Sequence, residues 1–308
     1  MPKTDNMPTE KTITYLLKTI SPGSTLKSIS EVEGSYSNYT HLIEAEHPGG
    51  IIERYIIRRY AIFSNYDRGE KARREYKTLE FAYENGIPAP KPVYLDETGL
   101  ILKMPGIVTE YVDGKSDLNP RDPIKWAEVM AETLAKIHSL PRGIEKDCYV
   151  LDANQEASWF LRDDGVPDFM KNYPRGMDVL KAAFKLHPKL KKTEPCLVHI
   201  DYWPGNILWK DDRIVAVVDW EEAAYGDPII DVAYARMEIS ILGFKSAAER
   251  FLETYVKLTG KPAANLLFWE LAAAARPMYS PETWNITESP RRDRFDKFVE
   301  RILDKTFS

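Results

Sequence analysis

Two segments in the second half of the chain constrain its fold more than any other feature: VHIDYWPGNILW, residues 198–209, and IVAVVDWEEAAYGDP, residues 214–228. The first predicts a strand that ends near His199, a turn forced by the Pro-Gly pair, and a second strand. The second segment begins with a β-branched run, which predicts a third strand that ends at Asp219. We therefore expect a strand–loop–strand arrangement whose strand ends carry polar side chains.

The polar side chains of these strand ends are Asp201, Asn206 and Asp219. Phosphoryl transfer uses this set of groups, because one carboxylate orients the attacking hydroxyl while an Asn and a second Asp hold Mg²⁺. Asp and Asn also favour turns, so each residue alone is explained as an ordinary turn residue. All three in this order favour a phosphoryl-transfer site, with Asp201 as the catalytic base and Asn206 and Asp219 as metal ligands.

This spacing resembles the catalytic and metal-binding segments of the aminoglycoside phosphotransferase and choline kinase family. The family pattern is His-x-Asp, four residues, Asn, and an Asp at the end of the next hydrophobic strand. The segment GDPIIDVA, residues 226–233, also resembles the family's stretch just after the metal Asp. The resemblance implies that His199 orders the catalytic loop and that Asp231 supports its backbone.

Ile200 stands where the family commonly has Gly. Because a β-branched residue disfavours Gly-only backbone angles, we expect an ordinary backbone conformation there.

The resemblance also implies the fold class: an α+β, bilobal, protein-kinase-like fold. Residues 1–112 would form an N-terminal nucleotide-covering lobe with an antiparallel sheet, and residues 113–308 a larger, mainly helical catalytic and acceptor-binding lobe. Alternation and intervening turns predict an antiparallel meander in the first lobe. Its three strands are expected at residues 26–33, 39–46 and 51–60.

Further elements are predicted by the spacing of apolar residues. A helix is expected over Tyr66–Asn85, with a buried stripe that includes Tyr83. More strands are expected at residues 93–95, 100–104 and 107–112. Helices are expected at residues 123–140, 246–259 and 263–275, with an irregular stretch between about 152 and 193.

The first lobe would supply the nucleotide-binding groups. The turn between its first two strands is small and polar, so its backbone N–H groups can approach phosphates, although such a turn is more often a plain hairpin. The segment GIVTEYVDG, residues 106–114, resembles the family's hinge, which implies that backbone groups from Glu110 to Val112 bind the adenine edge. The turn residues assigned to phosphate binding are Gly34, Ser35, Ser37 and Asn38.

The third strand would supply a cation for the phosphates. The family usually has Lys, whereas this chain has Arg58 and Arg59, which strand alternation sends to opposite faces. The resemblance favours Arg58, and Arg59 is expected to be a solvated strand charge. Arginine can grip phosphates with its planar fork but is not a neutral replacement for Lys. Glu75 is the expected partner of the cation; its competitor is Glu70, and a surface pair of Glu70 with Arg74 is the ordinary alternative.

Composition limits the class of protein. A net charge of -5 and a pI near 5.7 argue against a nucleic-acid partner. Two cysteines do not make a disulfide framework, and the polar N-terminal stretch has no signal-peptide character. No apolar span is long enough for a membrane. We expect a cytoplasmic protein with no membrane partner.

The predicted function is Mg²⁺-dependent transfer of the γ-phosphoryl group of ATP or GTP to a hydroxyl of a small molecule. The predicted acceptor is a small cationic or polyhydroxylated compound. Glu221 and Glu222, close to the metal Asp, would favour a cation by Coulomb attraction, although Glu221 is also explained as a strand-end surface residue. The sequence does not separate aminoglycosides from macrolides, choline, homoserine or a sugar, and it leaves the oligomeric state open.

Two other classes of protein remain as alternatives. A catalytically weak kinase-fold binding protein would be expected to lack a metal or base residue, and a metal-dependent phosphoesterase would not need the N-terminal meander.

Overall fold

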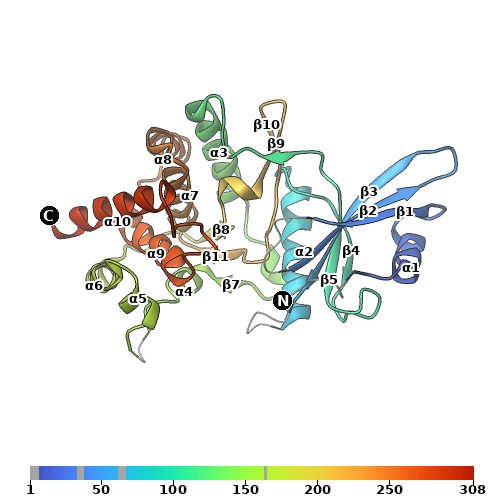
Figure 1. Cartoon of the computed structure of the whole chain (residues 1–308), viewed down its shortest axis with the longest axis horizontal. Coiled ribbons are helices and arrows are strands. Elements are labelled where there is room, and N and C mark those ends of the chain that lie inside the picture. Colours follow the sequence, from blue (N-terminus) through green and yellow to red (C-terminus); the bar gives the residue numbers. More distant parts are fainter. Residues whose placement is uncertain (1–6, 33–37, 62–66, 163–164) are drawn as a thin grey trace. The chain divides into compact units, whose positions relative to one another are not determined.

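The computed structural model describes residues 7–32, 38–61, 67–162 and 165–308. The chain divides into two compact units, the first made of residues 1–113, 143–149 and 216–221 and the second of the rest. The first unit is a sheet with helices α1 and α2, and the second is mostly helical (Figure 1). In the described ranges, no helix combines the length and the apolar character that crossing a membrane requires.

A five-stranded antiparallel sheet, in the order β1-β2-β3-β5-β4, forms the first unit. The predicted meander is therefore present, and each of its strands falls within two residues of its expected start. The strands are β1 Thr25–Glu31, β2 Asn38–Glu46, β3 Ile52–Tyr60, β4 Pro92–Asp96 and β5 Gly106–Glu110.

The strand expected at residues 100–104 is wrong. This segment is a turn, because the Asp96 carboxylate accepts hydrogen bonds from the backbone N–H groups of Leu100, Ile101 and Leu102 at 2.6 to 2.9 Å. Donors that would have extended the sheet are satisfied locally instead.

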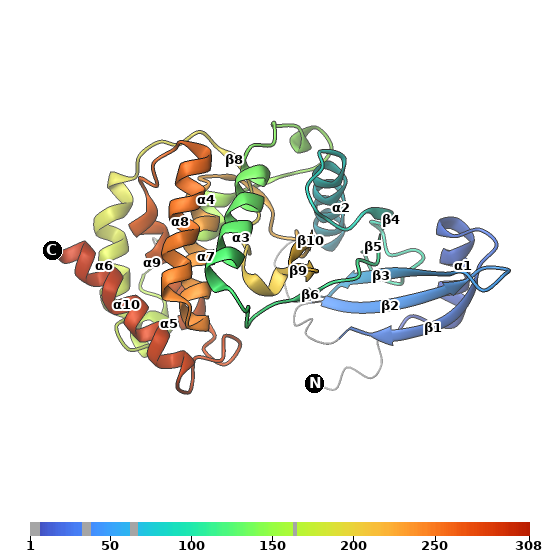
Figure 2. The same ribbon diagram turned by 90° about the horizontal axis from the view of Figure 1, so that it is seen from above.

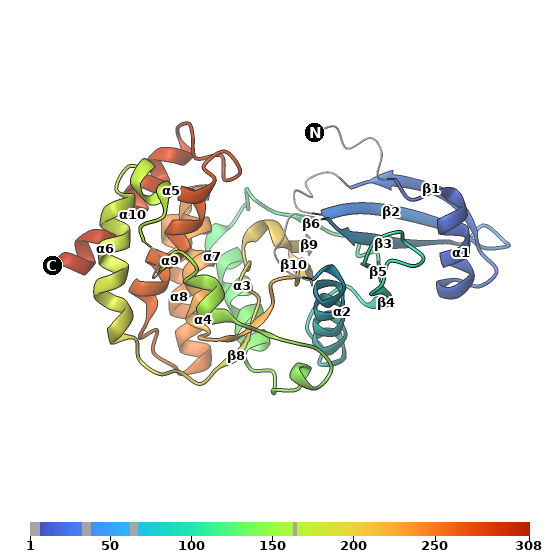
Figure 3. The same cartoon turned by 90° about the horizontal axis from the view of Figure 1, so that it is seen from below.

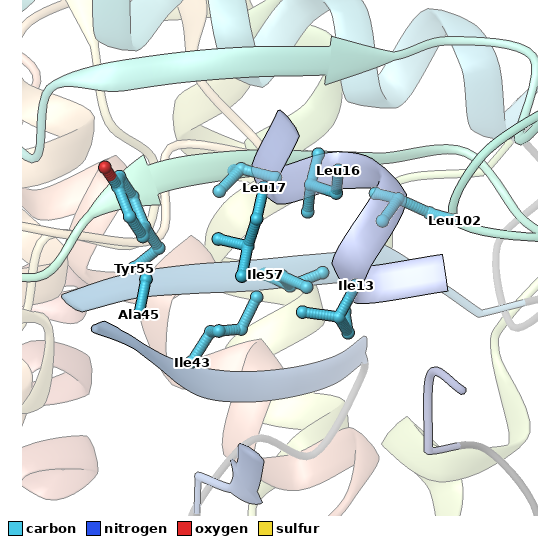
Figure 4. Packing of buried hydrophobic residues seen from close by; sticks show 9 residues of the cluster. Ile13, Leu16, Leu17, Ile43, Ala45, Tyr55, Ile57 and Leu102 are labelled. Carbon is cyan, nitrogen blue, oxygen red and sulfur yellow. The ribbon is translucent and has the colours of Figure 1, made fainter. Parts of the chain in front are cut away.

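Helix α1, Glu10–Ile20, was not expected, although its sequence carries the helical signal. The Thr9 side chain accepts from the Thr12 N–H at the N-cap, and apolar residues recur three and four positions apart. Leu16 and Leu17 lie against the sheet residues Ile43 and Ile57 in a closed apolar cluster (Figure 4). One face of the sheet is thereby covered.

Helix α2 spans Arg68–Glu84 and begins at an Asp67 N-cap, so most of the predicted helix is present. Its predicted apolar stripe is wrong at Tyr83, which is 45% exposed. The buried side of α2 includes two charged residues, Arg74 and Glu75. Their burial shows that this helix carries polar groups into the interior of the first unit.

The second unit is built from the remaining helices and from two small three-stranded sheets, β10-β9-β6 and β7-β11-β8. Helices α4 to α6 occupy the stretch that was expected to be irregular, and α7 and α10 were also not expected. The helices are α3 Pro123–His138, α4 Ala153–Ala157, α5 Asp168–Asn172, α6 Gly176–Leu186, α7 Ile229–Leu242, α8 Lys245–Thr259, α9 Leu266–Tyr279 and α10 Arg291–Phe307. The short strands are β6 Lys115–Ser116, β7 Leu151–Asp152, β8 Cys196–Val198, β9 Ile207–Lys210, β10 Arg213–Val217 and β11 Ala224–Gly226.

Helix α7 is the central helix of the second unit. It contacts α8, α9 and α10, and Figures 2 and 3 show these helices around it. Nearly all its residues are buried, so it lacks the one-sided pattern that identifies a surface helix. Its buried Arg236 donates to Glu270 of α9 at 3.0 Å, which satisfies both charges. This pair joins the middle of α7 to α9.

We predict that Leu16→Ala lowers the free energy of unfolding by about 2–5 kcal/mol, because it leaves a cavity in the cluster between α1 and the sheet. The matched control is Tyr15→Ala, whose side chain is 58% exposed and which should change stability by less than about 0.5 kcal/mol. Urea denaturation of both variants measures the difference. Equal stability of the two would show that α1 does not contribute to the core.

Candidate active site

The segment from β8 to β9 positions the predicted site residues of the second unit. After β8 ends at Val198, a loop carries Asp201, and a 3₁₀ turn over Pro204–Asn206 leads into β9. The Asn206 side chain donates through Nδ2 to the Asp201 carboxylate at 2.8 Å and to its carbonyl at 3.0 Å. Both bonds use the amide nitrogen, so the oxygen Oδ1 is the atom of Asn206 that can bind a cation. The structure thus brings the predicted base and one predicted metal ligand together.

Asp231 supports this loop from the first turn of α7. Its carboxylate oxygens accept the backbone N–H groups of His199 and Ile200, each at 2.7 Å, and Asp231 is fully buried. The His138 ring nitrogen Nε2 lies 3.0 Å from the same carboxylate, and its Nδ1 lies 2.7 Å from the Tyr255 hydroxyl. A chain of buried polar contacts therefore links α3, α7 and α8 to the loop.

The expected backbone conformation of Ile200 is wrong. Its φ angle is 67°, in the left-handed region that costs a β-branched residue roughly 1–2 kcal/mol. The Asp231 bond to its N–H and a 2.9 Å bond from Arg276 to its carbonyl oxygen hold it there. Side chains distant in the sequence therefore impose a conformation that the residue type disfavours.

His199 is fully buried, with its ring edge-on to Tyr202 at a centroid distance of 6.2 Å. The Tyr202 hydroxyl donates to the Met130 carbonyl of α3 at 2.9 Å. These residues anchor the loop and do not reach its exposed side, whereas the Asp201 side chain is 25% exposed.

A separate group of predicted site residues lies in the first unit, around Arg58. The Arg58 guanidinium lies 2.5 Å from the Asp219 carboxylate, 2.9 Å from Glu221 and 3.5 Å from Glu75. Strand alternation puts Arg58 on the same face of β3 as Tyr60, and both side chains contact Glu75 of α2. Asp219 also has a left-handed backbone, with φ 67°. The predicted cation thus lies among three carboxylates, one of them the predicted metal ligand.

Glu221 is the most highly connected carboxylate of this cluster. It pairs with Lys71 at 3.2 Å in addition to Arg58, and it accepts from the Asn38 amide at 2.5 Å. Burial alone would raise the pKa of Glu221, but the charges of Arg58 and Lys71 and the Asn38 bond outweigh burial and lower it to about 2. Glu221 is thus already paired within the first unit, and a cationic acceptor stays a prediction.

Glu75 accepts a hydrogen bond from the Tyr60 hydroxyl and is almost fully buried. Burial raises its pKa, because its share of the Arg58 charge does not offset the loss of water. The Glu70–Arg74 alternative does not describe Arg74, whose guanidinium donates to the Glu221 carbonyl at 3.2 Å.

The expectation that Arg59 is a solvated charge is also wrong. Arg59 is 3% exposed, shares the face of β3 that carries Ile57, and lies over the Tyr39 ring at 5.8 Å. Burial lowers its pKa. It is a packed residue on the opposite face from the Arg58 cluster.

The remaining predicted nucleotide-binding residues are less defined. The N–H groups of Glu110 and Tyr111 donate to the carbonyls of Lys91 and Arg54 within the first unit, which leaves Val112 as the candidate donor to a base. The turn residues Gly34, Ser35 and Ser37 lie outside the described residues.

Several residues of the site were not recognised in the sequence. Lys71 carries a weak signal, because it precedes Glu75 by one helical turn. Arg276 on α9 has none: it lies far along the chain from Asp201, yet its guanidinium is 3.6 Å from that carboxylate and 3.1 Å from Glu222. Glu222 is therefore also paired.

Residues 28–267 match the model of the phosphotransferase enzyme family. Acyl-CoA dehydrogenase family member 11 of Rattus norvegicus is 26% identical over 196 residues, which are 59% of this chain and 25% of that protein. The chain thus spans about a quarter of the length of this curated relative.

Solved structures share the fold. Choline kinase LicA from Streptococcus pneumoniae superposes with a TM-score of 0.61 at 19% identity, covering 96% of this chain and 99% of that one. The streptomycin–ATP–APH(2″)-IIa ternary complex gives a TM-score of 0.59 at 16% identity, covering 91% and 90%. The predicted kinase-like fold, with its N-terminal antiparallel sheet and helical C-terminal part, is confirmed.

We predict that Asp231→Asn lowers the free energy of unfolding by about 3 kcal/mol, because an amide NH₂ would face buried N–H donors and leave one unsatisfied. Asp304→Asn, at an exposed position of α10, serves as the control and should be nearly neutral. Chemical denaturation measures both. Wild-type stability in Asp231→Asn would contradict the support role.

Proposed function

The chain belongs to the phosphotransferase enzyme family, and on this premise we propose that it transfers the γ-phosphoryl group of ATP or GTP to a hydroxyl of a small molecule. The observation that carries the proposal is the hydrogen-bonded Asp201–Asn206 pair. Its loop is held by the Asp231 carboxylate, which accepts two backbone N–H groups of the loop. Strained backbone maintained by buried bonds is typical of functional sites.

Asp201 is the proposed catalytic base. Its partly exposed carboxylate accepts a hydrogen bond from the acceptor hydroxyl, orients the oxygen for attack and takes up the proton as the phosphoryl group is transferred. The Asn206 amide fixes one carboxylate oxygen and thereby limits the rotation of the group. His199 and Asp231 support the loop without meeting the substrate.

The donor atoms of the site suit Mg²⁺. Asp219 and Asn206 offer the hard oxygen ligands that this ion prefers. Among the residues that the structure describes, no group of three or more His, Cys, Asp or Glu side chains is arranged to hold a metal ion alone. Mg²⁺ in nucleotide sites is usually bound by one or two protein oxygens together with the phosphates, so these two ligands are sufficient in number. When bound, Mg²⁺ neutralises charge on those phosphates.

The first unit is proposed to bind the nucleotide. Arg58 would contact the phosphates, with Glu75 fixing its guanidinium, as the 3.5 Å pair suggests. Asn38 and the turn residues Gly34, Ser35 and Ser37 would cover the phosphates, and Val112 would meet the base edge. Because Arg58 also contacts Asp219 at 2.5 Å, we expect this contact to be exchanged for phosphate contacts when the nucleotide binds.

The acceptor class is less constrained. The similar proteins include a choline kinase and an enzyme complexed with streptomycin, and another carries an acyl-CoA dehydrogenase name. We propose testing aminoglycosides, macrolides, choline, homoserine, sugars and hydroxyl-bearing acyl-CoA thioesters. A catalytically weak binding protein of the same fold is the competing proposal, and the presence of Asp201, Asn206 and Asp219 favours the enzyme.

We predict that ADP release from Mg-ATP depends on one class of this panel, and that Asp201→Ala lowers kcat by about 10²–10⁴-fold with Mg-ATP affinity unchanged. Asp293→Ala, exposed on α10, is the control and should behave as wild type. Coupled ADP detection and calorimetry provide the two readouts. Turnover of Asp201→Ala within about tenfold of wild type would exclude this residue as the base.

We also predict that Arg58→Met weakens Mg-ATP binding by about 10–100-fold, because a charged hydrogen-bond donor to the phosphates is lost. Arg59→Met should leave this affinity unchanged, since Arg59 lies on the opposite face of β3. Equilibrium titration with a fluorescent nucleotide tests the pair. Equal losses in two folded variants would show that the cluster around Arg58 is not the phosphate site.

A further inference from the structure

Arg276, near the C-terminal end of α9, joins the predicted base to the rest of the second unit. Its guanidinium donates to the Ile200 carbonyl oxygen at 2.9 Å and to the Glu222 carboxylate at 3.1 Å, and lies 3.6 Å from the Asp201 carboxylate. The guanidinium carbon also lies 4.4 Å from the centre of the Tyr234 ring. One side chain thus touches the loop backbone, the base and two residues that fix its own position.

We propose that Arg276 is a positioning residue for phosphoryl transfer: it locks the left-handed loop at Ile200 and sets the direction of the Asp201 carboxylate. This inference rests on the proposed phosphotransferase function. It adds to the proposed site a residue of α9 that lies outside every motif recognised in the sequence.

The backbone geometry supplies the first argument. Ile200 is held at φ 67°, and its two backbone polar groups have separate anchors. Asp231 holds its N–H and Arg276 holds its carbonyl oxygen. Asp201 is the next residue, so the direction of its Cα–Cβ bond depends on both anchors. If only Asp231 remained, the Ile200–Asp201 peptide would be free to rotate toward a less strained conformation.

The rigidity of Arg276 supplies the second argument. Tyr234 is buried and supports the flat face of the guanidinium, while Glu222 and the Ile200 carbonyl occupy its edge. The planar guanidinium can donate hydrogen bonds to several acceptors at once, in a fixed geometry. A Lys ammonium on a flexible stem does not hold such a geometry. The guanidinium is thus preorganised, and Tyr234 of α7 together with Glu222 fixes its position beside the Asp201 carboxylate.

The test compares Arg276→Met and Arg276→Lys with a matched control, Arg294→Met. Arg294 also donates to a backbone carbonyl, that of Leu242 at 2.9 Å, but at the end of α7 remote from the loop in sequence. Two readouts are taken on the full chain. Amide hydrogen exchange of the peptide covering residues 197–207 reports loop order without requiring activity, and ADP release with the acceptor found in the panel gives kcat and KM.

Arg276→Met is expected to speed exchange in residues 197–207 and to lower kcat by about 100-fold, because a misplaced base loses its attack geometry. KM for ATP should stay within about twofold, since Arg276 does not meet the nucleotide. Arg276→Lys should recover part of kcat, and Arg294→Met should change neither readout.

Unchanged exchange together with kcat within about threefold of wild type in folded Arg276→Met would overturn the positioning role and leave the proposed function intact. If Arg276→Met does not fold, Arg276→Lys decides, with about a tenfold loss of kcat at constant KM expected and wild-type kcat contradicting it. A wild-type chain that releases no ADP would contradict the proposed function instead, and hydrogen exchange would still decide whether Arg276 orders the loop.

Discussion

The candidate site depends on the buried Asp231 carboxylate. It accepts two backbone N–H groups of the loop at 2.7 Å each and comes from the first turn of α7, the most enclosed helix of the second unit. A carboxylate at a helix N-terminus is favoured by the helix dipole as well as by these bonds. Because α7 is buried on all sides, the Asp231 carboxylate that it carries is held in a fixed position. This explains how a β-branched residue is held at a positive φ beside the proposed base.

In the first unit, three carboxylates that repel one another, Glu75, Asp219 and Glu221, lie close together around Arg58. Arg58 and Lys71 compensate three carboxylates with two cations, and the cluster is largely withdrawn from water. Buried charges of this kind are tolerated only when paired and hydrogen-bonded.

Much of the fold and part of the site can be predicted from the sequence. Strands β1 to β3 were predictable because short alternating runs are separated by turns. Asp201, Asn206 and Asp219 were predicted as site residues because their order matches a known chemistry, and the structure places Asp201 and Asn206 in hydrogen-bond contact. The conformation of Ile200 was not predictable, because Asp231 and Arg276, distant in the sequence, decide it.

Arg59 was predicted wrongly, because strand alternation shows that two neighbouring side chains point to opposite faces of β3 but not that both faces of the strand are covered. Helix α7 lacks periodicity since it is buried on all sides, whereas α1 carries a readable signal in its cap and apolar spacing.

The central claim is that this chain moves a phosphoryl group from a nucleotide to a hydroxyl. Phosphorus NMR of wild-type protein with Mg-ATP and the acceptor panel tests this claim most directly, because it shows where the γ-phosphorus goes. The account predicts a phosphate monoester that forms in step with ADP for one acceptor class. Release of inorganic phosphate alone, or unchanged ATP with every acceptor, would contradict it.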